Sequence, residues 1–219
     1  MSKPKRRQNI PIKAIIFDMD GVLVDTSPCH SAAYDLLWKS LSIKGPQYKT
    51  IAGRSTKEVI AQYGEHLNEQ QQIDAVSFKQ SSALKFLKTA NISFADTHDS
   101  LVQLYNAKIP MIVATSASRA SAELALGNAG LTMFFSQVIT SADVDKSKPA
   151  PDLFVAAIQS LGVMPEESLV LEDSQSGITA ALASGAYTVA VRESDTLDEK
   201  SVNHSHCLLY TSPSPRDRG

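Results

Sequence analysis

From residue 97 onward the sequence alternates amphipathic helical patterns with short apolar runs, and this alternation restricts the fold more than any other feature. Apolar strands separated by single helices are typical of a parallel sheet with right-handed crossovers. The sequence therefore predicts an α/β fold. The predicted helices span residues 100–107, 120–129, 152–161 and 176–184, and the predicted strands span residues 110–114, 135–140, 168–171 and 187–191.

An earlier apolar run, residues 14–17, reads as a strand buried on both faces and predicts the first strand of the same sheet. Between residues 26 and 95 the spacing of apolar residues is helical, and no strand is convincing. We therefore expect an inserted all-helical cap at 26–95, a core domain at 12–25 and 96–206, and a basic lead-in at 1–11.

Two carboxylates, Asp18 and Asp20, follow the first strand directly, and Gly21 lets the backbone turn away beyond them. Carboxylates a few Å apart repel each other unless a cation neutralises them, so a hard divalent ion such as Mg²⁺ is the simplest interpretation. A calcium-binding loop is excluded because Val22 and Leu23 stand where it needs an oxygen ligand and a glycine. An ordinary polar turn stays open on this segment alone.

Polar residues also follow the other predicted strands, where ligands bind in open α/β sheets. Thr115 and Ser116 end the second strand, Lys148 follows the third, and Glu172 and Asp173 end the fourth. Singly, each could be a helix cap or a solvated side chain. Together they supply carboxylates for a metal, a hydroxyl group and an ammonium group, which are the functional groups that phosphoryl transfer requires.

Composition limits the partners and the location of the protein. The net charge is −2 with both signs mixed, so neither nucleic acid nor an anionic membrane is expected as a partner. No apolar run approaches the ~20 residues that span a bilayer, and the basic N-terminus is not followed by a secretory signal. Cys29 and Cys207 lack the spacing of a metal site. We expect a monomeric cytoplasmic protein.

Four segments, FDMDGVLVDT, VATSAS, SKPAPD and LEDSQSG, resemble the four motifs of the haloacid dehalogenase superfamily in order and spacing. The resemblance covers roughly residues 12–191. It implies a Rossmann-like parallel sheet core. A helical insert directly after the first motif is similar to the cap of the subgroup that contains β-phosphoglucomutase and the sugar-phosphate phosphatases.

The resemblance also implies roles for the residues of the motifs. Asp18 would be the nucleophile that forms an aspartyl phosphate, and Asp20 the general acid and base. Mg²⁺ would be held by the Asp18 carboxylate, the Asp20 backbone carbonyl and Asp173, with Glu172 acting through a water or behind the direct ligands. Thr115, the backbone N–H of Ser116 and Lys148 would bind the phosphate oxygens.

The cap is expected to determine the substrate. Gly53 and Arg54 lie where the subgroup has its specificity loop, so Arg54 is a candidate to bind a second anionic group, with a solvated arginine as the equal alternative. His30 and Lys79 fall where the mutase has functional cap residues. Thr56 stands where the mutase pattern has an arginine, which favours a phosphatase.

The resemblance thus implies a Mg²⁺-dependent phosphatase that acts on a small phosphate ester, most simply a sugar phosphate. A β-phosphoglucomutase-like phosphomutase is the first alternative. The second alternative, a non-catalytic binding protein on the same scaffold, predicts a substitution at one of the motif carboxylates, and the sequence has none.

The C-terminal segment is unusual. Residues 207–217, CLLYTSPSPRD, resemble letter for letter the translation of an adapter used in sequencing libraries. We therefore expect residues 207–219 to be a non-native tail and exclude them from the fold prediction. The expected core strands are then complete at Val191, without the last strand and helix of the family.

Overall fold

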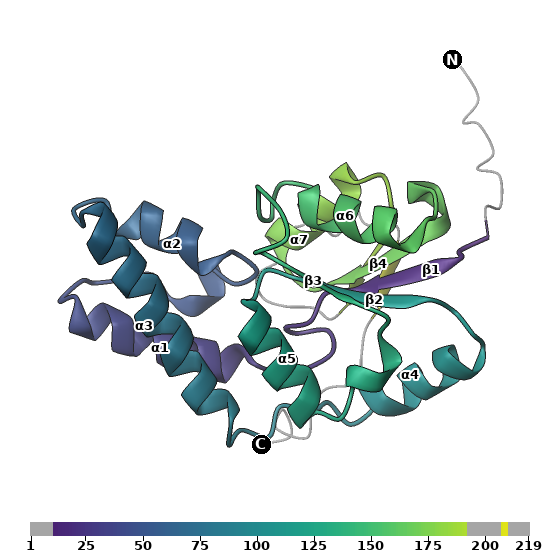
Figure 1. The fold of residues 1–219 in the computed structure, drawn as a ribbon, viewed down its shortest axis with the longest axis horizontal. Coiled ribbons are helices and arrows are strands. Elements are labelled where there is room, and N and C mark those ends of the chain that lie inside the picture. The colour runs from purple at the N-terminus through teal and green to yellow at the C-terminus, as the bar shows by residue number, and fades with distance from the viewer. Residues whose placement is uncertain (1–10, 192–206, 210–219) are drawn as a thin grey trace, which may run out of the picture.

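A parallel β-sheet forms the centre of the structure, a computed structural model that describes residues 11–191 and 207–209 (Figure 1). Its strand order is β3-β2-β1-β4-β5-β6, and every neighbouring pair is parallel. The strands are β1 (Ala14–Phe17), β2 (Met111–Thr115), β3 (Val138–Thr140), β4 (Ser168–Glu172), β5 (Tyr187–Val191) and β6 (Cys207–Leu209).

Helices cover both faces of the sheet, α6 and α7 on one and α4 and α5 on the other (Figure 1). Because side chains alternate along a strand, Ile16 packs with the first pair of helices while Ile15 and Phe17 pack with the second. All residues of β1 are therefore buried. The helices are α4 (Thr97–Asn106), α5 (Arg119–Asn128), α6 (Asp152–Leu161) and α7 (Gln175–Ala183), and short 3₁₀ turns span Thr132–Phe134 and Pro165–Glu167.

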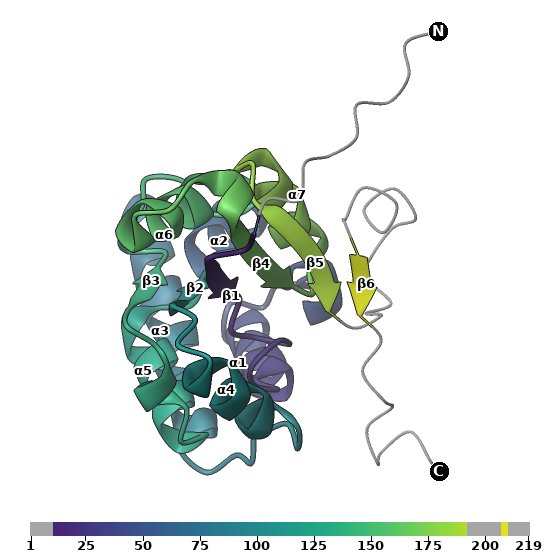
Figure 2. The same cartoon turned by 90° about the vertical axis from the view of Figure 1, so that its right-hand side faces the viewer.

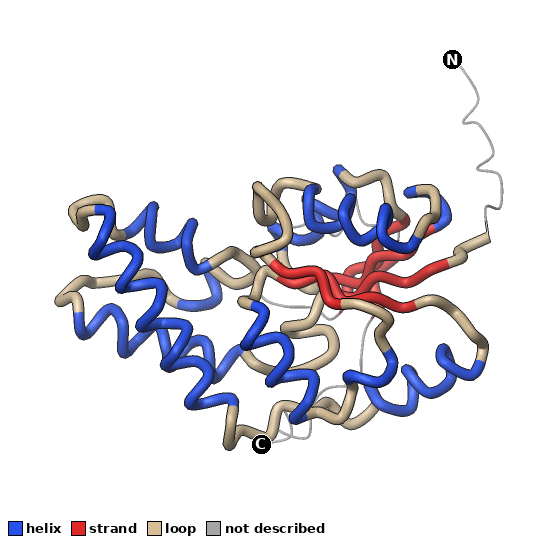
Figure 3. Tube along the Cα trace, in the orientation of Figure 1, coloured by secondary structure: helices blue, strands red, loops and turns tan. Residues whose placement is uncertain are grey.

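The inserted segment forms a helical cap beside the core, and Figure 3 shows it without strands. It consists of α1 (Ser27–Ser40), a 3₁₀ turn η1 (Tyr48–Thr50), α2 (Thr56–Tyr63) and α3 (Glu69–Leu87). Its own apolar core includes Leu37, Trp38 and Ile60. Ser55 caps α2 with a capping box to Glu58.

The described elements agree closely with the predicted ones, and two differences stand out. β3 begins at Val138 and not at residue 135, since residues 135–137 connect a 3₁₀ turn at Thr132–Phe134 to the strand, with Phe135 packed edge-on against Phe17. In addition, β6 pairs with β5 at the sheet edge, beyond the strands expected from the sequence (Figure 2). An edge strand offers unpaired backbone groups to any short strand-forming segment, so this pairing does not test whether residues 207–209 are native.

The order in which the chain visits the strands determines where a ligand can bind. From β1 the chain moves to β2 and β3 on one side, and β4 and β5 lie on the other. Ligands in open α/β sheets bind beyond the carboxyl ends of the strands at this switch point. Asp18, directly after β1, lies there. Among the described residues, none of the helices combines the length and apolarity needed to cross a membrane.

Candidate active site

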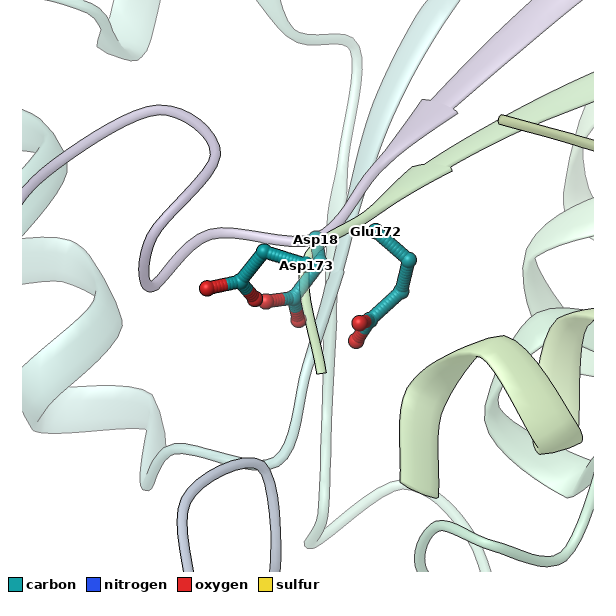
Figure 4. Close-up of side chains that lie close together, drawn as sticks. All are labelled: Asp18, Glu172 and Asp173. Carbon is teal, nitrogen blue, oxygen red and sulfur yellow. The ribbon is translucent and has the colours of Figure 1, made fainter. Parts of the chain in front are cut away.

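Three carboxylates meet at the carboxyl edge of the sheet (Figure 4). Asp18 follows β1, Glu172 ends β4, and Asp173 comes next. An oxygen of each lies within 4.8 Å of an oxygen of the other two. Because β1 and β4 are register neighbours, with Phe17 opposite Leu171, the residues that follow them necessarily meet. The structure thus brings together the three acidic side chains predicted from separate motifs.

Lys148 places a buried ammonium group among these carboxylates. Its Nζ atom lies 2.5 Å from Asp18 Oδ1 and 2.6 Å from Glu172 Oε1, and its side chain has no exposed surface. Burial opposes the charged form, but the two carboxylates outweigh it and raise the pKa of Lys148 above its ordinary value. Lys148 is therefore protonated and places a positive charge beside the predicted nucleophile.

Glu172 holds Lys148 in place. Its Oε1 atom accepts from Lys148, and its Oε2 atom accepts from the backbone N–H and the hydroxyl of Ser174 at 2.6 and 3.0 Å. Gly177 leaves the room that this carboxylate needs, since a Cβ atom there would lie 1.8 Å from Glu172 Oε1. Gly177 thus packs directly against a residue of the site.

Asp20 points toward the cap and not into the carboxylate cluster. Its Oδ1 atom accepts a hydrogen bond from the Thr26 hydroxyl and faces His30 Nε2 at 3.8 Å. Burial raises the pKa of Asp20, against the lowering effect of the Thr26 hydrogen bond. A carboxyl group with a raised pKa carries a proton more readily, which suits an acid that donates to a leaving group.

Thr115 and Ser116 lie at the end of β2, beside the carboxylates. Thr115 is fully buried, and its hydroxyl accepts from the backbone N–H of Ala117 at 3.1 Å. The Ser116 hydroxyl is buried and has no hydrogen-bond partner in the described part of the chain. Buried polar groups normally have a partner, so this hydroxyl is available to a ligand.

The four predicted cap residues line one small cavity together with Asp20 and Ser116. Its volume is about 40 Å³, enough for a few water molecules. The structure therefore places the predicted cap residues next to Asp20 and Ser116, at the carboxyl edge of the sheet. The cap residues concerned are His30, Gly53, Arg54 and Lys79.

Gly53 brings the backbone of the cap close to the core. Its φ is +77°, and an added Cβ would lie 2.4 Å from the Ser174 hydroxyl and 2.9 Å from the Ser176 hydroxyl. Glycine is needed both for the backbone conformation and for this approach. The next residue, Arg54, donates from Nη1 to Gln62 Oε1 at 2.7 Å and is not buried.

His30 and Lys79 contact each other on the cap side of the cavity. Lys79 Nζ lies 2.9 Å from His30 Nδ1 and 4.5 Å from the centre of the Tyr34 ring. Burial lowers the pKa of Lys79 to about 8, and burial with the Lys79 charge lowers the pKa of His30 well below its ordinary value. His30 is thus neutral near pH 7, and with Lys79 as donor to Nδ1 its proton lies on Nε2, toward Asp20.

The carboxylate cluster has the properties of a cation site. Burial raises the pKa of Asp18 to about 8 despite Lys148, and Glu172 and Asp20 raise it further. Burial, Glu172 and Asp18 similarly raise the pKa of Asp173 well above its usual range. One lysine is too little positive charge for so many buried carboxylates, and a hard divalent cation would supply the remainder.

Sequence reasoning missed two residues of the site. Thr26 orients Asp20, and Tyr48 lines the cavity with its ring stacked on His30 at 6.3 Å between centroids. Thr26 ends the first motif, six residues after Asp20, which was the available signal. Tyr48 lies in a stretch without periodicity, and nothing in the local sequence marks it.

The chain belongs to the haloacid dehalogenase-like hydrolase family, whose model matches residues 15–191. It is 35% identical over 185 residues to the fructose-1-phosphate phosphatase YqaB of Escherichia coli, covering 81% of this chain and 95% of that protein. It is 29% identical over 202 residues to hexitol phosphatase A of the same organism, covering 91% of each. The crystal structure of β-phosphoglucomutase from Clostridium difficile is similar with a TM-score of 0.80, at 21% identity and 90% coverage of each chain.

These comparisons confirm three expectations drawn from the sequence. The chain is a member of the superfamily indicated by the four motifs. Its fold is the expected α/β core with a helical cap. Its relatives are named phosphatases, in agreement with the expected phosphoric monoester hydrolase.

Proposed function

We propose that this protein is a Mg²⁺-dependent phosphatase that hydrolyses a small phosphorylated metabolite, a sugar phosphate, through an aspartyl-phosphate intermediate. The observation that carries the proposal is the position of Lys148, whose ammonium contacts both Asp18 and Glu172 at the carboxyl edge of the sheet. An Asp nucleophile and a fixed cation at one point suit transfer of a phosphoryl group and its charged oxygens.

In the first step, an oxygen of the Asp18 carboxylate attacks the phosphorus atom of the substrate. The bond from phosphorus to the sugar oxygen breaks, and Asp20 gives its proton to that oxygen, so the sugar leaves as a neutral alcohol. The raised pKa of Asp20 supports this proton transfer. Lys148, the Thr115 hydroxyl and the backbone N–H of Ser116 neutralise the charge that gathers on the equatorial oxygens.

In the second step, water attacks the phosphorus atom of the aspartyl phosphate. Asp20, now ionised, takes a proton from this water, the acyl phosphate bond breaks, and Asp18 returns as a carboxylate with release of inorganic phosphate. Thr26 keeps Asp20 oriented through its hydrogen bond. The same side chain thus acts as acid and then as base.

We assign the direct metal contacts to Asp18, Asp173 and the backbone carbonyl of Asp20. Glu172 stands behind them, because both of its carboxylate oxygens already accept hydrogen bonds from the protein. When bound, Mg²⁺ would neutralise carboxylate and phosphate charge and allow the Asp18 anion to approach the phosphate.

The cap bears on which phosphate ester can be the substrate, because it covers the site and contributes side chains to it. The cavity lined by Asp20, His30 and Lys79 holds only a few water molecules, so the cap has to move away from the core before a sugar phosphate can reach Asp20. On closure, His30, Lys79 and Arg54 would face the part of the substrate beyond the phosphate. The names of the relatives, a fructose-1-phosphate phosphatase and a hexitol phosphatase, favour a sugar or sugar-alcohol phosphate.

A phosphomutase is the second candidate, because His30 and Lys79, which contact each other, fall where the mutase has functional cap residues. His30 alone does not discriminate, since many phosphatases of the subgroup also have a histidine near there. Thr56 in place of the mutase arginine argues against it. A non-catalytic binding role is disfavoured because every motif carboxylate is present.

A phosphate-release assay tests the proposal. Protein with Mg²⁺ is offered a panel that includes fructose 1-phosphate, hexose 6-phosphates, hexitol phosphates and p-nitrophenyl phosphate, with a chelated sample and Asp18→Asn as controls. The proposal expects Mg²⁺-dependent phosphate release from at least one sugar phosphate and none from the Asp18→Asn protein. Interconversion of hexose phosphates without net phosphate release would identify the mutase instead, and inactivity on the whole panel would refute both.

A further inference from the structure

An acidic side chain outside the catalytic cluster, Asp143, is unusually well bound for a residue so close to the surface. Its Oδ2 atom accepts hydrogen bonds from the backbone N–H of Thr140 at 2.7 Å, the Thr140 hydroxyl at 2.8 Å and Arg119 Nη2 at 2.6 Å. Thr140 itself is fully buried. One carboxylate oxygen therefore connects a buried strand end with a side chain of another element.

The partners of Asp143 flank the two loops that carry the phosphate-binding groups. Thr140 ends β3 directly before the loop that leads to Lys148, and it is the register partner of Thr115 at the end of β2. Arg119 is the first residue of α5, directly after the loop that contains Ser116. A hydrogen bond of 3.4 Å from the Ser141 hydroxyl to the carbonyl of Ala117 joins the same two loops.

The ion pair between Arg119 and Asp143 contributes little to overall stability. The Arg119 and Asp143 side chains are 45% and 36% exposed, and ion pairs at that exposure contribute about 0–1 kcal/mol to folding. Their main effect is on geometry, because they connect the loop from Thr140 to Lys148 with the loop from Thr115 to Ser118. The two loops must hold a phosphate between them.

We propose that Asp143 is a positioning residue for the phosphate-binding site. It holds the loop that carries Lys148 at a set distance from the loop that carries Thr115 and Ser116, through Thr140 on one side and Arg119 on the other. The inference rests on the proposed function, in which these groups bind one phosphoryl group.

The first test compares Asp143→Ala with a matched control, Glu167→Ala. Glu167 also pairs with a cation at 2.6 Å, Lys13, and also accepts from a backbone N–H, that of Met164 at 3.2 Å, but it lies at the amino end of β4, away from the site. Asp143→Ala should lower kcat/KM by about tenfold to a hundredfold, the effect of misplacing a binding group by about 1 Å. Glu167→Ala should change it less than about twofold, since a surface pair contributes little.

Two features separate positioning from a general loss of stability. The fall in kcat/KM should be of similar size for every phosphate ester, including p-nitrophenyl phosphate, because all share the phosphoryl group. The midpoint of thermal unfolding should change by less than about 4 °C in Glu167→Ala, the shift expected for 1 kcal/mol in a chain of this size. In Asp143→Ala it should change by no more than about 12 °C, because the buried donors of Thr140 also lose an acceptor, at a cost of about 1–3 kcal/mol. A thermal shift well beyond that, matched by the loss of activity, would overturn the inference.

A double-mutant cycle tests the connection between the loops. If Asp143 acts through Arg119, Arg119→Ala should lower kcat/KM, and the double variant should lose little more than Asp143→Ala alone. Additive losses would overturn this link.

Amide hydrogen exchange tests the same point without any turnover and therefore separates the inference from the proposed function. Asp143→Ala should accelerate exchange of amides within residues 141–150 and leave the cap unchanged, whereas Glu167→Ala should not. Unchanged exchange in 141–150 would overturn the inference even if the wild-type protein is an active phosphatase. If exchange were faster in Asp143→Ala but the wild-type protein released no phosphate, the positioning contact would be upheld and the proposed function refuted.

Discussion

Replacing Gly177 by alanine is expected to damage this protein, although alanine usually improves a helix. The position lies in the first turn of α7. An alanine Cβ would lie 1.8 Å from Glu172 Oε1 and 1.9 Å from its carboxyl carbon, so the carboxylate has to move by on the order of 1 Å. The contact of 2.6 Å between Glu172 and Lys148 cannot survive that movement.

The size of the effect follows from the burial of both partners. Forcing an extra methyl group into a packed site costs about 1–3 kcal/mol, and breaking a buried ion pair costs up to about 3–5 kcal/mol. Both costs come from one displacement of the Glu172 carboxylate, so they overlap and total about 3–5 kcal/mol. The helix gains at most about 1 kcal/mol from alanine, so a net loss of about 2–4 kcal/mol is expected. In a chain of this size that lowers the unfolding midpoint by about 5–12 °C.

Gly127→Ala is the matched control, because Gly127 lies in α5 with no atom within 4 Å of its added Cβ. It should be neutral or stabilise the protein by up to about 1 kcal/mol. Thermal unfolding followed by circular dichroism measures both variants, and phosphate release measures the effect on Lys148. If Gly177→Ala behaved like Gly127→Ala in both assays, the role assigned to Glu172 would be wrong.

Three further predictions concern the acid and the cap. Asp20→Ala should keep most of the affinity for inorganic phosphate, measured by calorimetry, but lower kcat at least about a hundredfold because it removes the general acid and base; lost affinity with unchanged kcat would contradict this role. Arg54→Ala should lower kcat/KM about tenfold to a hundredfold on a physiological substrate, through loss of a charge-assisted contact, and barely affect p-nitrophenyl phosphate; an equal loss on both would place Arg54 in the chemistry or the fold. Burial lowers the pKa of Lys79 from 10.5 to about 8. Between these two pH values the unfolded chain binds a proton at Lys79 that the folded chain lacks, so the free energy of unfolding increases as the pH rises. Lys79→Met should therefore be about 1–3 kcal/mol more stable than wild type in urea at pH 7, and this advantage should shrink toward pH 10; an advantage independent of pH would show that the charge of Lys79 is not the cause.

The predictions from sequence succeeded where local patterns decide the structure. The apolar runs gave the strands of the core, and because parallel strands end at one edge, the residues after them had to meet, as Asp18, Lys148 and Glu172 do.

The rest depended on distances between side chains from different parts of the chain. The contact of Gly177 with Glu172, the hydrogen bond from Thr26 to Asp20 and the stacking of Tyr48 on His30 are each set by tertiary packing. Arg54 illustrates the same limit, because its bond to Gln62 on the next helix has no counterpart in the sequence pattern. The predicted start of β3 was wrong because residues 135–137 connect the 3₁₀ turn at Thr132–Phe134 to the strand, and Phe135 packs edge-on against Phe17, a contact that the local sequence does not show.

The most direct test of this account is to detect the aspartyl phosphate. The protein with Mg²⁺ and a substrate identified by the phosphate-release panel is quenched in acid within a single turnover, and its peptides are examined by mass spectrometry. The account predicts a phosphoryl group on Asp18 that forms and decays at least as fast as the enzyme turns over, and none in Asp18→Asn. Turnover without a phosphorylated Asp18, or with the phosphoryl group on another residue, would contradict it.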